Sequence, residues 1–128
     1  EKNLEVEKEL DLDGTPLTWE AVNDHIGVIY LDREKSLLPS ISKHFGVSSA
    51  VISRVCKDNT EMYYGEYIGL QRASHASDLI EEGMSLSEVW QKCGYRSRAS
   101  FSKDYKKWNK QSPEDTVECY TLERSMTK

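Results

Sequence analysis

Residues 38–57, LPSISKHFGVSSAVISRVCK, and residues 86–106, LSEVWQKCGYRSRASFSKDYK, follow one pattern. In each stretch apolar side chains stand at the first, fourth and eighth positions, and a glycine follows. This spacing puts the apolar side chains on one side of a short helix, and glycine is typical of a helix end. A second periodic segment begins after Gly46 and after Gly94. The sequence therefore contains an internal repeat at a shift of 48 residues, with one extra residue in the second turn.

Each repeat predicts a helix-turn-helix. A short helix, a glycine turn and a second helix with small polar and basic residues on its outer side make up this motif. The first helix braces the second, and the second enters the major groove of DNA. We therefore expect helix-turn-helix units at about residues 37–57 and 85–107.

Three further helices are predicted around these units. Thr18 can cap a helix whose apolar spacing continues to about Arg33. Residues 62–82 have the pattern of a long helix, and Gly83 suits its end. The sequence SPED at 112–115 is a strong start signal for a last helix, because proline and acids are favoured in a first turn. The expected fold is all-α, with about seven helices and no sheet.

The long helix has a length that suits DNA. Its 21 residues would extend over roughly 31 Å, and one turn of B-DNA is about 34 Å. A rigid rod of that length can hold two recognition helices in successive major grooves on one side of the duplex.

The charge is unevenly distributed along the chain. The net charge is −5, which is unusual for a DNA-binding protein, but residues 38–113 hold 11 Lys or Arg against 8 Asp or Glu. Residues 1–37 and 114–128 are acidic. Residues 96–110 hold six bases and a single acid, Asp104. Because the local field governs attraction to nucleic acid, this segment favours DNA binding.

Several other classes of protein are disfavoured. The odd number of cysteines and their spacing argue against a disulfide framework and a zinc site, and indicate reduced core thiols in a cytoplasmic protein. The histidines have no ligand partner at fitting spacing. The chain has no signal-peptide pattern and no apolar run of the roughly 20 residues that span a bilayer, so no membrane contact is expected. Without a phosphate loop or a catalytic constellation, we expect neither an enzyme nor a cofactor.

The two ends of the chain are expected to lie outside the domain. Residues 1–16 are charged and finish in a turn cluster, which indicates either a linker from a missing upstream region or a frayed terminus. The domain itself is expected over residues 17–121, and residues 122–128 are expected to form a tail.

Three groups of residues match a known family in spacing. They are Gly46-Val47-Ser48, Ile52-Ser53-Arg54 and Cys56-Lys57 in the first unit; Tyr67, Arg72, Ala76, Leu79 and Ile80 in the long helix; and Gly94-Tyr95, Phe101-Ser102-Lys103, Tyr105-Lys106 and Ser112-Pro113 in the second unit. In these residues the chain resembles the AraC/XylS family of bacterial transcription regulators, from about Leu37 to Val117.

This resemblance implies a homeodomain-like fold of two helix-turn-helix subdomains joined by a long central helix. It implies double-stranded DNA and RNA polymerase as partners, and a sensing or dimerisation region that is absent from this chain. Four positions depart from the family pattern. Cys56 stands where an aromatic residue is usual, and Trp90 replaces a small residue of the bracing helix. Glu61 and Lys110 stand where the family favours glycine, so a changed turn geometry is expected at both positions.

The outer side of each second helix carries the candidates for base reading, because recognition helices present their N-terminal half to base edges. The candidates are Ser49, Ala50, Ser53 and Arg54 in the first unit and Arg98, Ala99, Ser102 and Lys103 in the second. Ala50 offers only an apolar contact, for example to a thymine methyl group. Arg54 suits guanine or phosphate, and a salt bridge to an acid such as Asp58 is its alternative role.

A second set of basic residues is expected to contact phosphates, which position a protein without reading sequence. This set consists of Lys57, Arg96, Lys106, Lys107 and Lys110. A merely solvated basic surface is the alternative. By charge, the second unit is expected to supply more of the affinity.

Two functions remain open at this stage. The first is a sequence-specific DNA-binding domain that recruits or blocks RNA polymerase, as in a transcription activator or repressor. The second is a protein-interaction module that kept the fold and lost its affinity for DNA. The acidic termini and the small outward residues Ala50 and Ala99 favour the second function.

Overall fold

The computed structural model describes residues 17–126, with side chains to residue 123. This part of the chain forms seven α-helices and no strand, which confirms the predicted fold class. The predicted linker at residues 1–16 lies outside the described residues. The helices are α2 (Trp19–Ile29), α3 (Leu38–Phe45), α4 (Ser49–Thr60), α5 (Tyr64–Glu81), α6 (Leu86–Lys92), α7 (Arg98–Asn109) and α8 (Pro113–Met126).

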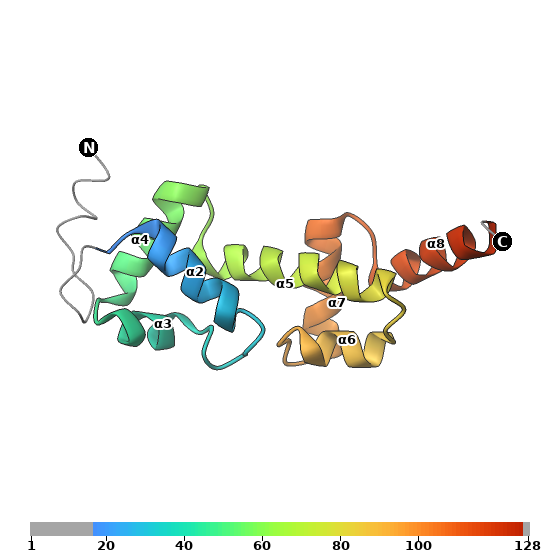
Figure 1. The fold of residues 1–128 in the computed structure, drawn as a ribbon, viewed down its shortest axis with the longest axis horizontal. Helices are drawn as coiled ribbons and strands as arrows, with labels where there is room; N and C mark the ends of the chain where they lie inside the picture. The colour runs from blue at the N-terminus through green and yellow to red at the C-terminus, as the bar shows by residue number, and fades with distance from the viewer. Residues whose placement is uncertain (1–16, 127–128) are drawn as a thin grey trace. The chain divides into compact units, whose positions relative to one another are not determined.

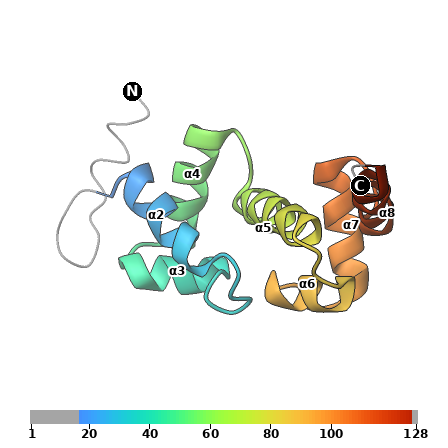
Figure 2. The ribbon, with the colours of Figure 1, turned by 45° about the vertical axis from the view of Figure 1, so that its right-hand side comes forward.

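The helices belong to two compact units, which we describe separately. Unit 1 extends to Ile68 and unit 2 begins at Gly69, so the boundary lies within α5. Figure 1 shows α2, α3 and α4 grouped in unit 1, and α6, α7 and α8 grouped in unit 2. The rotated view in Figure 2 shows the same grouping. Each unit therefore contains one of the two repeated helix pairs.

The core of unit 1 is formed by the apolar faces of α2, α3 and α4. Val22, Ile41 and Ile52, one from each of these helices, are completely buried. Two tyrosines of α5 complete the unit with hydrogen bonds. The Tyr64 hydroxyl donates to the backbone oxygen of Ser36 over 2.5 Å, and the Tyr67 hydroxyl donates to Oδ1 of Asn23 over 2.7 Å.

In unit 2, α7 packs against both α6 and α8. Phe101 and Tyr105 of α7 are completely buried, as is Val89 of α6. The Tyr105 hydroxyl donates to Oγ1 of the buried Thr116 over 3.0 Å. This bond ties the middle of α7 to the first turns of α8.

One carboxylate of α7 is directed into unit 2. Asp104 accepts hydrogen bonds from the Tyr95 hydroxyl at 2.6 Å and from Nε1 of Trp108 at 3.2 Å. Burial raises the pKa of the Tyr95 phenol, and the hydrogen bond to Asp104 raises it further, so Tyr95 remains a donor. Asp104 is the single acid of the basic segment 96–110. Its two partners are uncharged groups, so these bonds fix the position of the carboxylate, and the segment is basic because six bases outnumber this one acid.

The second helix of each repeat ends at a residue in the left-handed conformation. Glu61 follows α4 with φ 62°, and Lys110 follows α7 with φ 65°. The amide of Glu61 donates to the oxygen of Lys57, and the amide of Lys110 donates to the oxygen of Lys106. The sequence suggested a changed geometry at both turns. Instead, both keep the conformation that glycine favours, although neither residue is glycine.

Two helix boundaries differ from those expected. Helix α2 ends at Ile29 instead of about Arg33. A side-chain turn replaces its last part, since Oδ1 of Asp32 accepts from the backbone amides of Glu34 and Lys35 at 3.0 and 2.9 Å.

Helix α5 begins at Tyr64, because Oγ1 of Thr60 accepts from the amide of Met62 and holds that residue outside the helix. Its 18 residues correspond to about 27 Å instead of roughly 31 Å. At the other end of the chain, α8 continues to Met126, so helix extends into the segment for which a tail was expected.

Replacing Gly69 with alanine is expected to destabilise the protein. An added Cβ would lie 2.9 Å from both carboxylate oxygens of Asp104, which are held by Tyr95 and Trp108. Displacing this carboxylate weakens two hydrogen bonds, so we expect Gly69→Ala to lower the free energy of unfolding by about 1–2 kcal/mol in chemical denaturation. Gly65→Ala in the same helix is the control, because nothing lies within 4 Å of its added Cβ. A Gly69→Ala protein as stable as the Gly65→Ala protein would contradict this packing.

A pair of stacked histidines lies on the surface of unit 1. The rings of His25 in α2 and His44 in α3 are 3.8 Å apart at their centroids and inclined by 8°. Burial lowers the pKa of His25, and the neighbouring His44 lowers it further. The folded state therefore favours the neutral form of His25, whereas the unfolded chain titrates near the ordinary value of about 6.5.

This pair is expected to make folding sensitive to acid. As pH falls below about 6.5, the unfolded chain binds the proton first, so stability is present above that pH and lost as pH falls toward the folded-state pKa. We expect thermal unfolding temperatures to fall between pH 7.5 and 5.5, and His25→Gln to reduce this dependence. An unchanged pH dependence in His25→Gln would show that the stacked pair is not its source.

Candidate nucleic-acid interface

Helix α4 packs one face into the core of unit 1, and its opposite face lies on the surface. Ser48 caps it by accepting from the amide of Val51 at 3.3 Å. The buried side chains of α4 are Val51, Ile52, Val55 and Cys56. These positions recur at three- and four-residue spacing, so the residues between them project away from the core.

The four predicted base-reading residues of α4 differ in exposure. Ala50 is exposed, and Ser53 and Arg54 are partly buried. Ser49 is also partly buried, and its hydroxyl donates to Oγ of Ser42 in α3 over 3.3 Å. The structure therefore brings Ala50, Ser53 and Arg54 to the outer side of α4, whereas the Ser49 hydroxyl is engaged with the bracing helix.

The predicted base-reading residues of α7 are more exposed than those of α4. Ser97 caps the helix by accepting from the amide of Ser100 at 3.1 Å, and the buried positions are Phe101 and Tyr105. On the remaining surface Arg98, Ala99 and Lys103 are exposed and Ser102 is partly buried. All four lie in the first half of the helix, which is the part that recognition helices direct at base edges.

An ion pair at the start of α7 was not predicted from the sequence. Nη2 of Arg98 lies 2.7 Å from Oε2 of Glu114, and the two side chains are 45% and 56% exposed. The hydrogen bond from Arg98 holds the pKa of Glu114 below its usual range. The start signal at residues 112–115 correctly placed Glu114 in a first helical turn. Its proximity to Arg98 depends on how α8 packs against α7, which local sequence does not encode.

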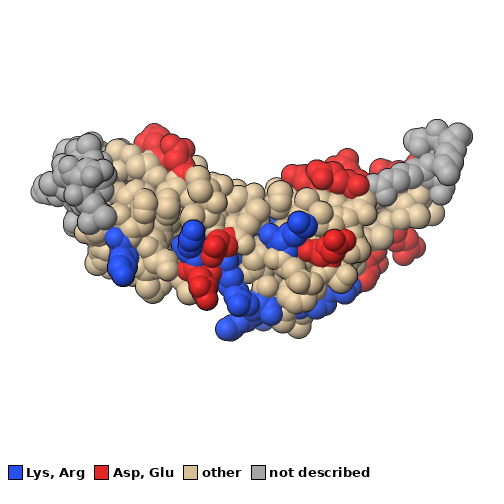
Figure 3. All heavy atoms as spheres, turned by 60° about the horizontal axis from the view of Figure 1, so that its bottom comes forward, with Lys and Arg blue, Asp and Glu red and all other residues tan. Residues whose placement is uncertain are grey.

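The predicted phosphate-contacting residues lie on the surface, but two of them have aromatic neighbours. Lys57 donates to the backbone oxygen of Glu61, and its Nζ lies 4.4 Å from the centroid of the Tyr63 ring. Nζ of Lys107 lies 4.9 Å from the Trp108 ring. Arg96, Lys106 and Lys110 are exposed as well. On the face shown in Figure 3, the largest group of Lys and Arg side chains lies along the lower edge of the view.

The described residues contain no group of three or more His, Cys, Asp or Glu that could hold a metal ion. Cys56 and Cys93 are buried free thiols and Cys119 is exposed. Burial raises the pKa of Cys56, and it raises that of Cys93 to about 11, so both remain protonated at neutral pH. None of the described helices is long and apolar enough to cross a membrane.

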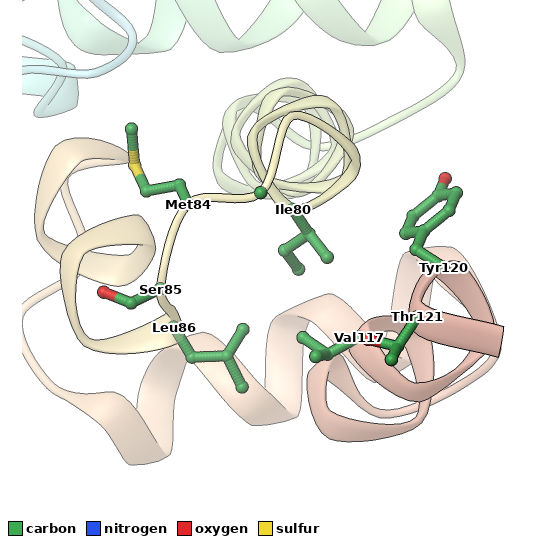
Figure 4. A pocket seen from close by; sticks show the side chains of 8 residues that line it. Ile80, Met84, Ser85, Leu86, Val117, Tyr120 and Thr121 are labelled. Carbon is green, nitrogen blue, oxygen red and sulfur yellow. The ribbon is translucent and has the colours of Figure 1, made fainter. Parts of the chain in front are cut away.

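Unit 2 also contains an open hollow between the end of α5, the start of α6 and α8. Figure 4 shows Ile80, Leu86 and Val117 directed toward it. Met84 and Tyr120 lie at its margins. The hollow contains no cluster of chemically reactive side chains, and the residues of the predicted interface do not line it.

Comparisons with known proteins agree with this arrangement. The family model described as helix-turn-helix domain matches residues 41–118, which is more than half of the chain and includes all of the second repeat and all but the first three residues of the first. No curated protein matches the chain.

Several solved structures have the same fold. The C-terminal domain of the two-component response regulator yesN from Fusobacterium nucleatum is similar with a TM-score of 0.71 and 21% identity, over 77% of this chain and 95% of that chain. The C-terminal domain of AraT, a response regulator from Geobacillus stearothermophilus, has a TM-score of 0.73 and 20% identity, over 78% and 83%. A probable AraC family transcriptional regulator from Rhodopseudomonas palustris has a TM-score of 0.68 and 16% identity, over 79% and 94%.

At these low identities the solved structures show that the chain has the same fold and show nothing more. The family is shown by the family model, which matches the part of the chain that contains the repeats. The matched region begins within α3 and ends within α8, so it includes nearly all of both helix pairs. The chain therefore belongs to the AraC-type helix-turn-helix family of DNA-binding regulatory domains.

Proposed function

We propose that this domain binds double-stranded DNA sequence-specifically, with α4 and α7 in successive major grooves. The carrying observation is that both helices are capped, have one buried face, and present small or basic side chains on the other face in their first half. A helix that enters a groove needs this combination, because bulky side chains there would prevent close approach to the base edges.

Within this proposal the side chains have different roles. Arg54, Arg98 and Lys103 donate to bases, and the exposed Ala50 and Ala99 make apolar contacts. Ser53 and Ser102 lie beside them as further donors or acceptors. Ser49 can bond to a base only if its hydroxyl gives up the hydrogen bond to Oγ of Ser42.

The phosphate contacts would position the domain on the duplex. They are assigned to Lys57, Arg96, Lys106, Lys107 and Lys110. Four of these five belong to unit 2, where residues 96–110 hold six bases against the single acid Asp104. Unit 2 therefore supplies more of the affinity than unit 1.

In its regulator, the domain would act on transcription by recruiting or blocking RNA polymerase. A sensing or dimerisation region elsewhere in the regulator would supply the signal. The domain has no catalytic role in this proposal.

A protein-interaction module is the second candidate function. The net charge of −5 and the engagement of Arg98 by Glu114 favour it, since both reduce attraction to phosphates. The two candidates differ in one measurable property, which is the salt dependence of binding to a duplex.

Duplex binding is expected to weaken steeply with salt. Each phosphate contact releases counterions, so the logarithm of the binding constant falls with the logarithm of salt concentration with a slope of about −0.9 per contact. The measurement is fluorescence anisotropy of promoter DNA of the regulator at several salt concentrations. Lys106→Ala should reduce the slope by about one unit. Absence of binding at low salt would refute the DNA-binding proposal and favour the interaction module.

The same assay tests the unequal roles of the units. Arg98→Ala and Lys103→Ala are expected to weaken binding by about 1–3 kcal/mol each, and Arg54→Ala by less. Lys92→Ala, which removes an exposed charge of α6 outside the proposed contacts, serves as the control. Equal losses, or a larger loss for Arg54→Ala, would contradict the assignment of most affinity to unit 2.

A further inference from the structure

Arg98 occupies a position where a cation is not favoured by the helix itself. It is the first residue of α7, directly after the cap Ser97. The positive end of the helix dipole lies there and repels a guanidinium group. Oε2 of Glu114, at 2.7 Å from Nη2, supplies the opposite charge. Glu114 itself lies in the first turn of α8, where the dipole stabilises a carboxylate.

The backbone that carries Glu114 is fixed to α7. Thr116, two residues further, is buried and accepts from the Tyr105 hydroxyl at 3.0 Å. Oγ of Ser112 accepts from the amide of Asp115 at 3.0 Å and caps the start of α8. Glu114 therefore extends from a helix start that is capped by Ser112 before it and tied to the recognition helix through Thr116 after it. The partner of Arg98 is part of the packed unit and not a side chain of a loose terminus.

The contact leaves much of the guanidinium available. Only Nη2 donates to Glu114, through a single hydrogen bond. Arginine has a planar fork of N–H donors, and the fork recognises O6 and N7 of guanine with two parallel hydrogen bonds. A carboxylate that holds one corner of the fork restricts its orientation and reduces the rotamer freedom that base recognition must otherwise remove.

We propose that Glu114 is a positioning residue for Arg98, which holds the guanidinium at the start of α7 in the orientation that reads a guanine. This inference rests on the proposed DNA-binding function. Glu114 touches no DNA in this arrangement and acts through Arg98 alone. Its effect is on the preference for the correct sequence, because a phosphate can be contacted from many orientations and a base edge from few.

Neutralising Glu114 is predicted to change the affinity for the preferred duplex in the direction opposite to that expected from charge alone. A carboxylate near DNA repels phosphates, so its neutralisation should by charge alone strengthen binding to every duplex. If Glu114 positions Arg98, neutralisation should weaken binding to the preferred sequence despite the lost repulsion.

The test uses the 128-residue chain and two duplexes. One is the sequence that the wild-type protein selects from a random library, and the other has the same composition in scrambled order. We expect Glu114→Gln to reduce the preference for the selected duplex by about three- to tenfold, as expected for an exposed but oriented ion pair. Glu118→Gln, which neutralises an exposed acid one turn later in α8, is expected to leave the preference unchanged.

A second pair of variants separates positioning from folding. In an Arg98→Ala background, Glu114→Gln should change the preference no further, since Glu114 acts only through Arg98. An equal loss in that background, or stronger binding of Glu114→Gln to both duplexes alike, would overturn the proposal. Failure of the wild-type protein to select any sequence would instead refute the proposed function, so the two failures are distinguishable.

Discussion

The burial of one face of each second helix against its short bracing helix is the constraint on which this structure depends. Ile52 in unit 1 and Phe101 in unit 2 are completely buried. A helix fixed along one face has its opposite face fixed in direction as well. The outward side chains of α4 and α7 are therefore placed by the core and not by contacts of their own, which leaves their identity free to serve recognition.

The sequence predicted this arrangement well where local rules decide it. The repeat, the caps Ser48 and Ser97, and the glycine after α3 are local features, and the predicted helices were all found. The boundaries were less accurate where a side chain competes for backbone amides. Asp32 accepts from the amides just after the expected end of α2, and Thr60 takes the amide of Met62, the expected first residue of α5.

The candidate site was predictable as a set of positions and less so as a set of contacts. The spacing of α7 placed Arg98, Ala99 and Lys103 on its outer side, where the structure has them. The engagement of Arg98 by Glu114 and of Ser49 by Ser42 could not be predicted in the same way. Each joins residues on different helices, so it depends on packing that no periodicity within one helix describes. The stacking of His25 on His44 is a third example.

Glu61 and Lys110, the two residues in the left-handed conformation, occupy equivalent places in the two units but have opposite charges. A left-handed conformation costs a residue with a side chain about 1–2 kcal/mol relative to the ordinary one, yet both positions carry a charge. Glu61 and Lys110 each follow the negative end of a helix dipole, which disfavours the acid and favours the base. At the end of α4, Lys57 offsets part of this unfavourable charge because its Nζ donates to the backbone oxygen of Glu61, whereas at the end of α7 Lys110 adds a cation to those of Lys106 and Lys107. The two units therefore differ in the charge at the ends of their second helices, and they are not interchangeable modules.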